Sequence, residues 1–334
     1  MDGGRYMKFG LILDGGHQPG QSREQVFRET LGKAILARRY GFHSLWTGPG
    51  YLTQGWHPTV LLARVAAEVP GMELGMVGIL PLYHPVELAE QLSTLDVISG
   101  GSVVLGAAIG WRDFQFRAFE VPTGQRLSRF IEVLETLKAL WTQERVDHEG
   151  KHFRLHDLPG AGIPLQKPHP KIFIAANLDP GVSRAATLAD GWLVSSRATL
   201  GTIARQLGLY RTALQGTGRP GYVAAWREMF VATDKEEAIA TIRPHVEWLY
   251  RDRANLGHNR ALPAADRIDV PFEQVLEGRF ILGSAEDCLA ELRKYQTAGV
   301  SEIIMRCQWP GLATDRALDA IERFGRDVLP RVEA

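Results

Sequence analysis

Residues 80–116 read LPLYHPVELAEQLSTLDVISGGSVVLGAAIGWRDFQF, and this stretch decides the fold. A polar helical pattern ends at Ser99-Gly100-Gly101, a run of small and branched apolar residues follows from Val103 to Ile109, and Gly110-Trp111-Arg112-Asp113 comes directly after it. Helix, glycine turn, buried strand and polar loop in this order form the repeating unit of a parallel α/β barrel, whose active site lies at the carboxyl ends of the strands. We therefore expect site residues directly after this strand, with Arg112 as a catalytic candidate.

Strand and helix signals alternate along the whole chain, which favours an α/β fold over a segregated α+β fold. Eight short, mostly apolar runs are predicted to be buried strands: Lys8–Leu13, His43–Thr47, Glu73–Ile79, Val103–Ile109, Lys171–Ala176, Gly191–Ser195, Trp226–Ala232 and Glu302–Cys307. Eight strands are the number that closes a TIM barrel. The sequence therefore predicts a (β/α)8 TIM barrel as a single domain over residues 1–334.

Local signals mark several helix ends. Gly41 and Gly299 each follow a helical pattern and precede a strand, at the position where a left-handed residue ends a helix. Ser284 with Asp287 three residues later is the expected start of the last long helix before the eighth strand.

Two segments interrupt the alternation. Residues 144–170 contain an alternating pattern around Glu149-Gly150, which predicts a hairpin inserted before the fifth strand. Residues 254–279 contain proline and charged residues with little periodicity. Two interpretations of this second segment stand side by side: a lid over the mouth of the barrel, or a plain solvated loop.

The composition favours a small molecule as the partner. Lys plus Arg equals Asp plus Glu at 38 each, with no basic stripe, so we expect no binding of nucleic acid. No run approaches the roughly 20 apolar residues of a membrane span, and the N-terminus has no signal-peptide core, so we expect no membrane association. Cys288 and Cys307 are too few for a disulfide framework, which favours a reducing cytoplasm. Met1 and Met7 both remain candidate start residues.

The loops after the predicted strands are rich in glycine, aromatic residues and arginine, which suits a flat anionic cofactor. The residues expected to contact a substrate are Tyr51, Trp56, Ser196 and Trp309. His17, His57 and His84 lie in three different loops without the short spacing of metal-ligand pairs, so no metal site is predicted. No nucleophile elbow, phosphate loop or dinucleotide fingerprint is present, so acyl and nucleotide chemistry lack their usual motifs.

A phosphate site is predicted at Asn177-Leu178-Asp179-Pro180-Gly181-Val182, where a strand passes into a helix whose first amides point toward the barrel mouth. The alternative is that Asp179 caps this helix without any ligand, and a capping acid would repel phosphate. Arg126 and Arg129, at the start of the helix after the fourth strand, either add positive charge to the site or are solvated.

Several motifs occur in order along the chain. They are Leu80-Pro81-Leu82-Tyr83-His84-Pro85, Leu95-Asp96-Val97-Ile98-Ser99-Gly100-Gly101, Gly110-Trp111-Arg112, Arg126 to Trp141, Ala189-Asp190-Gly191-Trp192 and Trp309-Pro310-Gly311-Leu312. In these motifs the chain resembles the luciferase-like flavin monooxygenase superfamily, which includes bacterial luciferase, alkanesulfonate monooxygenase and deazaflavin-dependent oxidoreductases, and the resemblance runs from Lys8 to Pro330. The resemblance implies a TIM barrel, usually a homodimer formed through helices near strands two to four, with reduced FMN or the deazaflavin coenzyme at the carboxyl ends of the strands.

The resemblance also implies roles for individual residues. The flavin ring is expected against Gly78 and Ile79, where relatives often have a non-prolyl cis peptide. Ile109 and Trp111 are expected to wall the ring or the ribityl chain, and one of Arg126 and Arg129 to assist the phosphate. The residues expected around the phosphate are Ala176, Asn177, Leu178, Gly181 and Val182.

One departure from the family concerns catalysis. Many relatives carry a histidine just after strand two, where this chain has Gly48-Pro49-Gly50-Tyr51, so His17 and His57 are the remaining histidine candidates. The leading hypothesis is a two-component monooxygenase that takes reduced FMN from a separate flavin reductase and uses dioxygen on a small organic substrate. The alternatives are a deazaflavin-dependent oxidoreductase that transfers hydride and a non-catalytic flavin-binding protein.

Overall fold

The computed structural model describes residues 7–13, 20–53 and 55–332. His17, one of the two histidine candidates, lies outside the described residues. Within them, no helix combines the length and the apolar composition that crossing a membrane requires.

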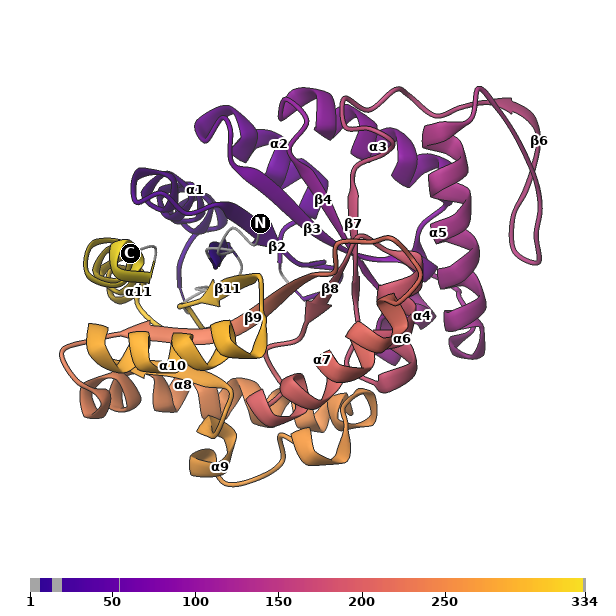
Figure 1. The fold of residues 1–334 in the computed structure, drawn as a ribbon. Helices are drawn as coiled ribbons and strands as arrows, with labels where there is room; N and C mark the ends of the chain where they lie inside the picture. The colour runs from indigo at the N-terminus through magenta and orange to yellow at the C-terminus, as the bar shows by residue number, and fades with distance from the viewer. Residues whose placement is uncertain (1–6, 14–19, 54, 333–334) are drawn as a thin grey trace. The chain divides into compact units, whose positions relative to one another are not determined.

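The eight parallel strands of the (β/α)8 TIM barrel are present, with helices between them (Figure 1). The sheet order is β10-β9-β11-β1-β2-β3-β4-β7-β8, and pairing of β9 with β8 closes the ring. The barrel strands are β1 (Lys8–Ile12), β2 (Ser44–Thr47), β3 (Glu73–Ile79), β4 (Val103–Ala108), β7 (Lys171–Ala175), β8 (Gly191–Val194), β9 (Tyr222–Val231) and β11 (Glu302–Arg306). Seven of the eight predicted strands agree with these to within one residue at each end.

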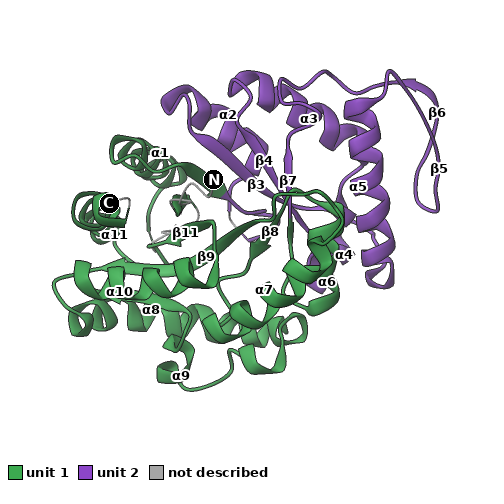
Figure 2. Cartoon of the chain, viewed as in Figure 1, with its two compact units in different colours: residues 1–46, 174–334 green, residues 47–173 purple. Residues whose placement is uncertain are grey.

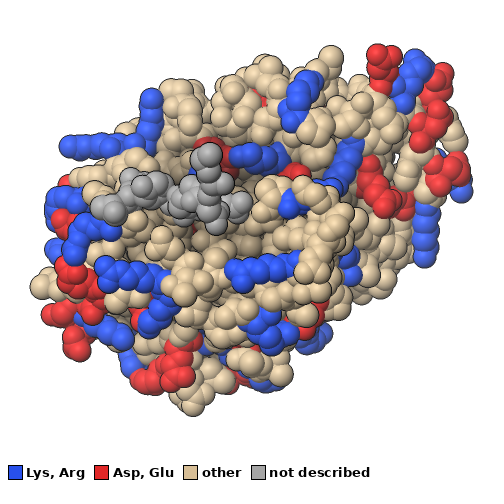
Figure 3. All heavy atoms as spheres, in the orientation of Figure 1, with Lys and Arg blue, Asp and Glu red and all other residues tan. Residues whose placement is uncertain are grey.

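The helices follow the strands in chain order. They are α1 (Arg23–Arg39), α2 (Pro58–Glu68), α3 (Pro85–Ile98), α4 (Asp113–Ala118), α5 (Arg126–Thr142), α6 (Asp179–Leu188), α7 (Leu200–Leu214), α8 (Lys235–Asn255), α9 (Phe272–Leu276), α10 (Ala285–Ala298), α11 (Thr314–Arg323) and α12 (Leu329–Val332). Short turns of tighter or wider helix are η1 (Leu80–Leu82), η2 (Thr123–Gln125), η3 (His258–Ala261), η4 (Ala264–Asp266) and η5 (Phe324–Val328). On the face in Figure 3, Lys and Arg side chains are interspersed with Asp and Glu.

The chain divides into two compact units, residues 47–173 (unit 2) and residues 1–46 with 174–334 (unit 1), shown in Figure 2. In unit 2 all seven residues of β3 are buried, as expected for a parallel strand covered on both faces. β3 pairs with β4 from Leu74 opposite Val103 to Ile79 opposite Ala108. α5 buries an apolar stripe, and its Trp141 indole donates to the Ala89 carbonyl of α3 at 3.2 Å.

In unit 1 the long strand β9 departs from the prediction. The predicted run Trp226–Ala232 begins too late, because Ala224 and Ala225 lack the branched side chains that mark a strand, although both are buried against β8. The second half of β9 pairs in parallel with an extra strand, β10 (Phe280–Gly283), which the sequence did not predict. β10 is only four residues long and follows a stretch without periodicity, so it carries little pattern.

The predicted helix ends are confirmed. Gly41 and Gly299 have left-handed backbone angles, with φ of +80° and +97°. Ser284 caps α10 in a capping box: its hydroxyl accepts from the Asp287 amide, and the Asp287 carboxylate accepts from the Ser284 amide.

The two segments that interrupt the alternation are both ordered. In the first, β5 (Arg145–Glu149) and β6 (Arg154–Pro159) form an antiparallel pair. In the second, the solvated-loop interpretation of residues 254–279 is wrong, because η3, η4 and α9 fold there with His258, Asp266 and Ile268 buried. The Asp266 carboxylate accepts from the Thr199 amide at 3.0 Å and from the Thr202 hydroxyl at 2.8 Å, which anchors this segment to α7. The lid interpretation stays a prediction.

Candidate functional site

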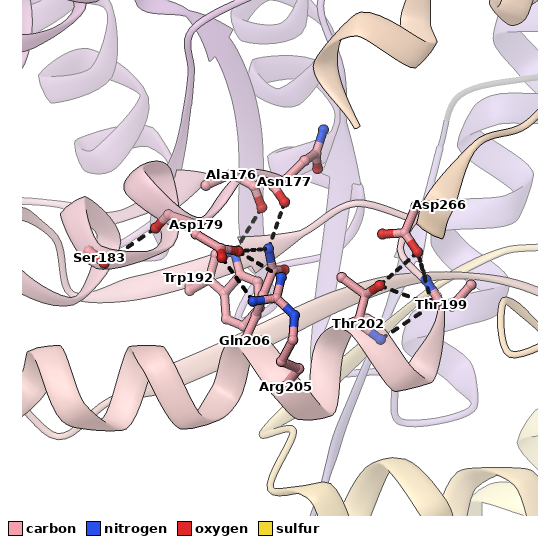
Figure 4. A network of polar contacts seen from close by, with 10 residues as sticks. All are labelled: Ala176, Asn177, Asp179, Ser183, Trp192, Thr199, Thr202, Arg205, Gln206 and Asp266. Carbon is pink, nitrogen blue, oxygen red and sulfur yellow. Dashed lines mark hydrogen bonds and ion pairs between the residues drawn. The ribbon is translucent and has the colours of Figure 1, made fainter. Parts of the chain in front are cut away.

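The predicted phosphate segment lies in unit 1 at the start of α6 (Figure 4). Leu178 is the N-cap residue and forms no side-chain capping bond, and Asp179 and Pro180 occupy the first turn. The Asp179 carboxylate accepts two hydrogen bonds of 2.8 Å from the Arg205 guanidinium and one of 2.8 Å from the Gln206 amide. The interpretation of Asp179 as the helix cap is therefore wrong: α7 holds this carboxylate instead.

This pairing changes the electrostatics of the helix start. The hydrogen bonds from Arg205 and then Gln206 lower the pKa of Asp179 to about 2, so the carboxylate is ionised and its charge is matched by Arg205. The repulsion that a free acid would exert on an anion is reduced accordingly. The first turn of α6 keeps the positive end of its helix dipole.

Hydrogen bonds to the backbone carbonyl groups and to one side chain of the segment before α6 fix its conformation. The Trp192 indole donates to the Ala176 carbonyl at 2.9 Å, and Gln206 donates to the Asn177 carbonyl at 2.8 Å. The side-chain amide of Asn177 donates to the Ala261 carbonyl at 3.0 Å. These bonds, most of which Figure 4 shows, hold the loop in one conformation before the helix begins.

Small residues and an arginine border the same turn. A Cβ atom on Gly181 would lie 2.9 Å from the Cβ of Ala176, so glycine is required for this close contact, and Val182 is buried behind it. A terminal nitrogen of Arg184 lies 3.9 Å from that same Cβ position. The residues of this turn therefore fit a phosphate group: a helix start without a side-chain cap, a compensated acid and an adjacent cation. Sequence reasoning missed Arg184, although its place one turn into the predicted helix was the available signal.

In unit 2, Ile79 is the one residue predicted to face the flavin ring that belongs to a buried apolar cluster. Ile79, Leu82 and Phe116 are buried together, and Tyr51 packs against them. Gly110 has φ of +78°, and a Cβ atom there would lie 2.6 Å from the Ile79 side chain and 2.9 Å from the Phe116 ring. The cluster thus depends on glycine at position 110.

The backbone at Gly78 departs from the family expectation. Among the described residues, the cis peptide bond is the one between Lys167 and Pro168, so the bond between Gly78 and Ile79 is trans. Ile79 ends β3 with φ of −83° and ψ of 86° and leads directly into η1.

Two arginines after β4 in unit 2 lie against aromatic rings. Arg112 is the N-cap residue of α4, and its guanidinium lies 4.7 Å from the centre of the Trp111 ring. Ile109 lies half-buried just before this pair. Arg126 forms an ion pair with Asp113 and lies 4.4 Å from the centre of the Phe116 ring. Arg126 is therefore a partly buried cation and not a solvated helix arginine.

Arg129 has a different environment from the one predicted. Its Nε donates to the Pro81 carbonyl at 3.0 Å, and its guanidinium lies 4.9 Å from the centre of the Phe153 ring. Burial lowers the pKa of Arg129, while Glu132 opposes the shift. These contacts tie Arg129 to the η1 turn.

Tyr51 and His57 lie close together in unit 2. The Tyr51 hydroxyl donates to the Tyr83 hydroxyl at 2.5 Å, and the Tyr51 and His57 rings are 6.0 Å apart. Burial raises the pKa of both tyrosines, and burial lowers the pKa of His57, so at neutral pH these three groups are uncharged. Trp56 is half-buried just before His57.

Ser196 and Trp309, predicted to contact substrate, lie in a buried polar cluster of unit 1. The Trp309 indole donates to Glu228 Oε2 at 2.8 Å, and Arg197 donates to Glu228 Oε1 at 2.5 Å and to the Ser196 hydroxyl. Sequence reasoning missed Glu228. Its signal was a charged residue inside the otherwise apolar run of β9, where burial requires compensation.

The two cysteines have no reactive setting. Cys288 and Cys307 are buried, and burial raises the pKa of each thiol to about 12. In the described part of the chain, no group of three His, Cys, Asp or Glu side chains is placed to hold a metal ion.

Comparison with known proteins supplies the family context. A family model described as luciferase-like monooxygenase matches residues 7–302. The chain is 25% identical to the oxygenase component of flavin-dependent trigonelline monooxygenase from Acinetobacter baylyi, over 93% of this chain and 91% of the relative. It is 27% identical to an F420-dependent glucose-6-phosphate dehydrogenase from Kineococcus radiotolerans, over 89% and 90%. Among solved structures, monooxygenase RslO1 from Streptomyces bottropensis superimposes with a TM-score of 0.84 at 25% identity, covering 97% of this chain and 99% of that one.

Proposed function

Because the chain belongs to the luciferase-like monooxygenase family, we propose that it is the oxygenase component of a two-component monooxygenase. In this proposal it binds reduced FMN delivered by a separate flavin reductase and oxygenates a small organic substrate with dioxygen. The named relatives are enzymes that act with a flavin or with F420, so the chain is an enzyme of the luciferase-like oxidoreductase type. These relatives argue against the interpretation as a non-catalytic flavin-binding protein.

The observation that carries the proposal is the first turn of α6. Asp179 is held by Arg205 and Gln206, and no side chain caps the helix, so the turn suits the phosphate that FMN bears. Gly181 and Val182 lie in this turn, and Arg184 adds a cation beside it. In the mechanism these residues bind and orient the phosphate end of the cofactor.

The other predicted cofactor residues would contact the flavin ring and not the phosphate. Gly78, Ile79, Ile109 and Trp111 would wall the ring, and the buried Ile79, Leu82 and Phe116 side chains would keep water from it. Reduced flavin, when bound, supplies the electrons that activate dioxygen. An apolar wall serves such chemistry because it excludes the side reactions that water permits.

Deazaflavin-dependent hydride transfer is the second candidate. It is favoured by the 27% identity to the F420-dependent dehydrogenase. Because F420 also bears a phosphate, the α6 turn serves both candidates, and the choice between them rests on the coenzyme that the protein prefers.

The deciding experiment is an anaerobic titration of the protein with reduced FMN and, separately, with reduced F420, followed by admission of air. We expect tighter binding of reduced FMN and oxygen uptake that depends on the protein. Preference for F420 without oxygen uptake would replace the proposal with the second candidate. Binding of neither coenzyme would refute both.

A pair of variants tests the placement of the phosphate. Gly181→Ala introduces the clash with Ala176 and is expected to weaken coenzyme binding. Gly201→Ala in α7 is the matched control, because a Cβ atom there meets nothing within 4 Å. Equal affinity for reduced FMN in the two variants would contradict the role of the α6 turn.

We also propose a homodimer that forms through helices of unit 2. Val60 on α2 and Val97 and Ile98 at the end of α3 are exposed aliphatic side chains, with 70%, 54% and 53% of their surface accessible. We expect light scattering to give twice the chain mass and Val97→Glu to reduce it, while Ile35→Glu on α1 leaves it unchanged. A monomeric native protein would refute this proposal.

A further inference from the structure

The carboxyl end of β11 carries an arginine that faces the interior of the barrel. Arg306 is opposite Glu228 of β9, and Glu302 is opposite Ala224, so residues 302, 304 and 306 share one face of the strand. The Ser44 hydroxyl of β2 donates to the Glu302 carboxylate of β11, and this hydrogen bond passes over Gly10 of β1, the strand between them. A Cβ atom on Gly10 would lie 2.2 Å from the serine oxygen, so glycine leaves room for the bond. Side chains of β2 and β11 thus meet on this face, which identifies it as the interior.

The charges at this end of the barrel do not balance. Glu228 is fully buried and its two carboxylate oxygens are occupied, Oε1 by Arg197 and Oε2 by Trp309. Burial opposes its ionisation, but Arg306 and Arg197 hold the pKa of Glu228 below its usual range, so it counts as one negative charge. Arg197 and Arg306 supply two positive charges against it.

Neighbouring groups do not remove the excess positive charge. Arg227 donates to the carbonyls of Ala198 and Ser195, and Arg279 donates to the carbonyl of Arg197, and all of these acceptors are neutral. The buried Asp266 is engaged with Thr199 and Thr202 on α7.

Arg306 has hydrogen-bonding capacity to spare. Its interactions with described residues are electrostatic: Arg306 interacts with Glu228 and Tyr250, and the centre of the Trp226 ring lies 6.0 Å from its guanidinium. The Nε atom of Arg306 and the indole Nε1 of Trp226 are both buried, and neither has an acceptor in the described part of the chain. Arg306 as a whole is partly exposed, but its Nε atom is buried. Buried donors without acceptors are costly, and an anionic acceptor would satisfy these donors and also balance the excess positive charge beside Glu228.

We propose that Arg306, with Trp226 beside it, binds the carboxylate of a small organic substrate at the carboxyl end of β11. One carboxylate supplies the single negative charge that balances Arg197, Arg306 and Glu228, and its two oxygens accept from the guanidinium in a geometry that arginine favours. This inference rests on the proposed function, since it assigns the substrate class of that same enzyme.

The probe for this site is benzoate, with benzamide as its neutral analogue of similar shape. Binding to the wild-type protein is followed by calorimetry and by the fluorescence of the tryptophans, first without cofactor and then with saturating reduced FMN under anaerobic conditions. When reduced FMN already fills the cofactor site, benzoate can no longer bind as an anion at the start of α6. If acceptor atoms of the flavin itself occupied Arg306, benzoate would not bind there either. Benzoate binding that persists with reduced FMN therefore indicates a separate site for a substrate carboxylate. We expect benzoate to bind more tightly than benzamide in both conditions.

Variants locate the binding at Arg306. Arg306→Met is expected to weaken benzoate about 10- to 100-fold, the effect of losing a charge-assisted hydrogen bond, and to change benzamide binding little. Arg306→Lys keeps the charge and is expected to retain part of the affinity, which also covers the case in which the methionine variant fails to fold. Arg331→Met is the matched control, since Arg331 is exposed and pairs with Glu286.

The outcomes separate this inference from the proposed function. Equal binding of benzoate and benzamide to the wild type, or equal benzoate binding by Arg306→Met and Arg331→Met, would overturn the inference. Displacement of benzoate by reduced FMN would also overturn it, because the acceptor would then belong to the cofactor. Each of these results would leave the binding of reduced FMN, and hence the proposed function, intact.

Discussion

Gly110→Ala tests the apolar cluster of unit 2 through a single added methyl group. The residue has φ of +78°, and its new Cβ atom would lie 2.6 Å from Ile79 Cγ2 and 2.9 Å from Phe116 Cε2, both of which are side chains of the buried cluster. A left-handed residue with a Cβ atom costs about 1–2 kcal/mol, and overpacking a core adds about 1–3 kcal/mol. We therefore expect the free energy of unfolding to fall by about 2–5 kcal/mol, measured by urea denaturation, and the affinity for reduced FMN to fall with it.

Two matched variants separate the backbone effect from the contact. Gly71 has φ of +88° with nothing within 4 Å of its Cβ position, so Gly71→Ala measures the left-handed backbone alone. Gly124→Ala has open space and no left-handed backbone, so it measures neither effect. The predicted order of stability loss is Gly110→Ala, then Gly71→Ala, then Gly124→Ala. Equal losses at positions 110 and 71 would show that Ile79 and Phe116 move aside freely, and the reasoning about a rigid wall would be refuted.

Further predictions concern an ion pair, a helix cap and the thiols. Asp179→Asn removes the half-exposed ion pair with Arg205 and should lower stability at pH 7 by up to about 1 kcal/mol. Since the folded pKa of Asp179 is about 2 and its ordinary value is 3.8, the pair stabilises the fold above pH 4 and the contribution is lost as the pH falls toward 2, so wild type and variant should converge in acid urea titrations. Ser284→Ala should cost about 1 kcal/mol in thermal or urea unfolding, and Ser284→Asp should restore most of it; no loss would contradict the capping box. Cys288 and Cys307 should resist iodoacetamide in the native protein at pH 8, as mass spectrometry would show, and rapid labelling of either would contradict their burial.

Local features were predictable where one short segment contains all the necessary information. The capping box at Ser284 needs only four consecutive residues, and β3 is predicted from seven consecutive residues that suit burial. The (β/α)8 arrangement follows from repeating such local signals, with the parallel strand order supplied by the alternation of strand and helix. The family resemblance added the cofactor class and the expected positions of its binding residues.

Features that depend on distant partners were not predictable. Asp179 beside Pro180 is chemically suited to capping, and only Arg205, 26 residues further on, decides that it pairs instead. Glu228 is buried because Arg197 and Trp309 reach it from 31 and 81 residues away. A single sequence carries no record of such pairings, since each side chain is compatible with several partners until the fold selects one.

The extra strand β10 has a consequence for how this enzyme tolerates change. Glu228 is opposite Arg306 on one side of β9 and opposite Phe280 on the other, so β10 begins at the level of the buried carboxylate. Arg279, just before β10, is bound to the carbonyl of Arg197, the partner of that carboxylate. Arg279 also donates to the carbonyls of Gln274, Val275 and Arg267, so this one side chain joins the segment before β10 to the buried ion pair. We therefore expect a change of length between Gly257 and Gly278 to disturb the register of β10 and, through Arg279, the position of Arg197 beside Glu228.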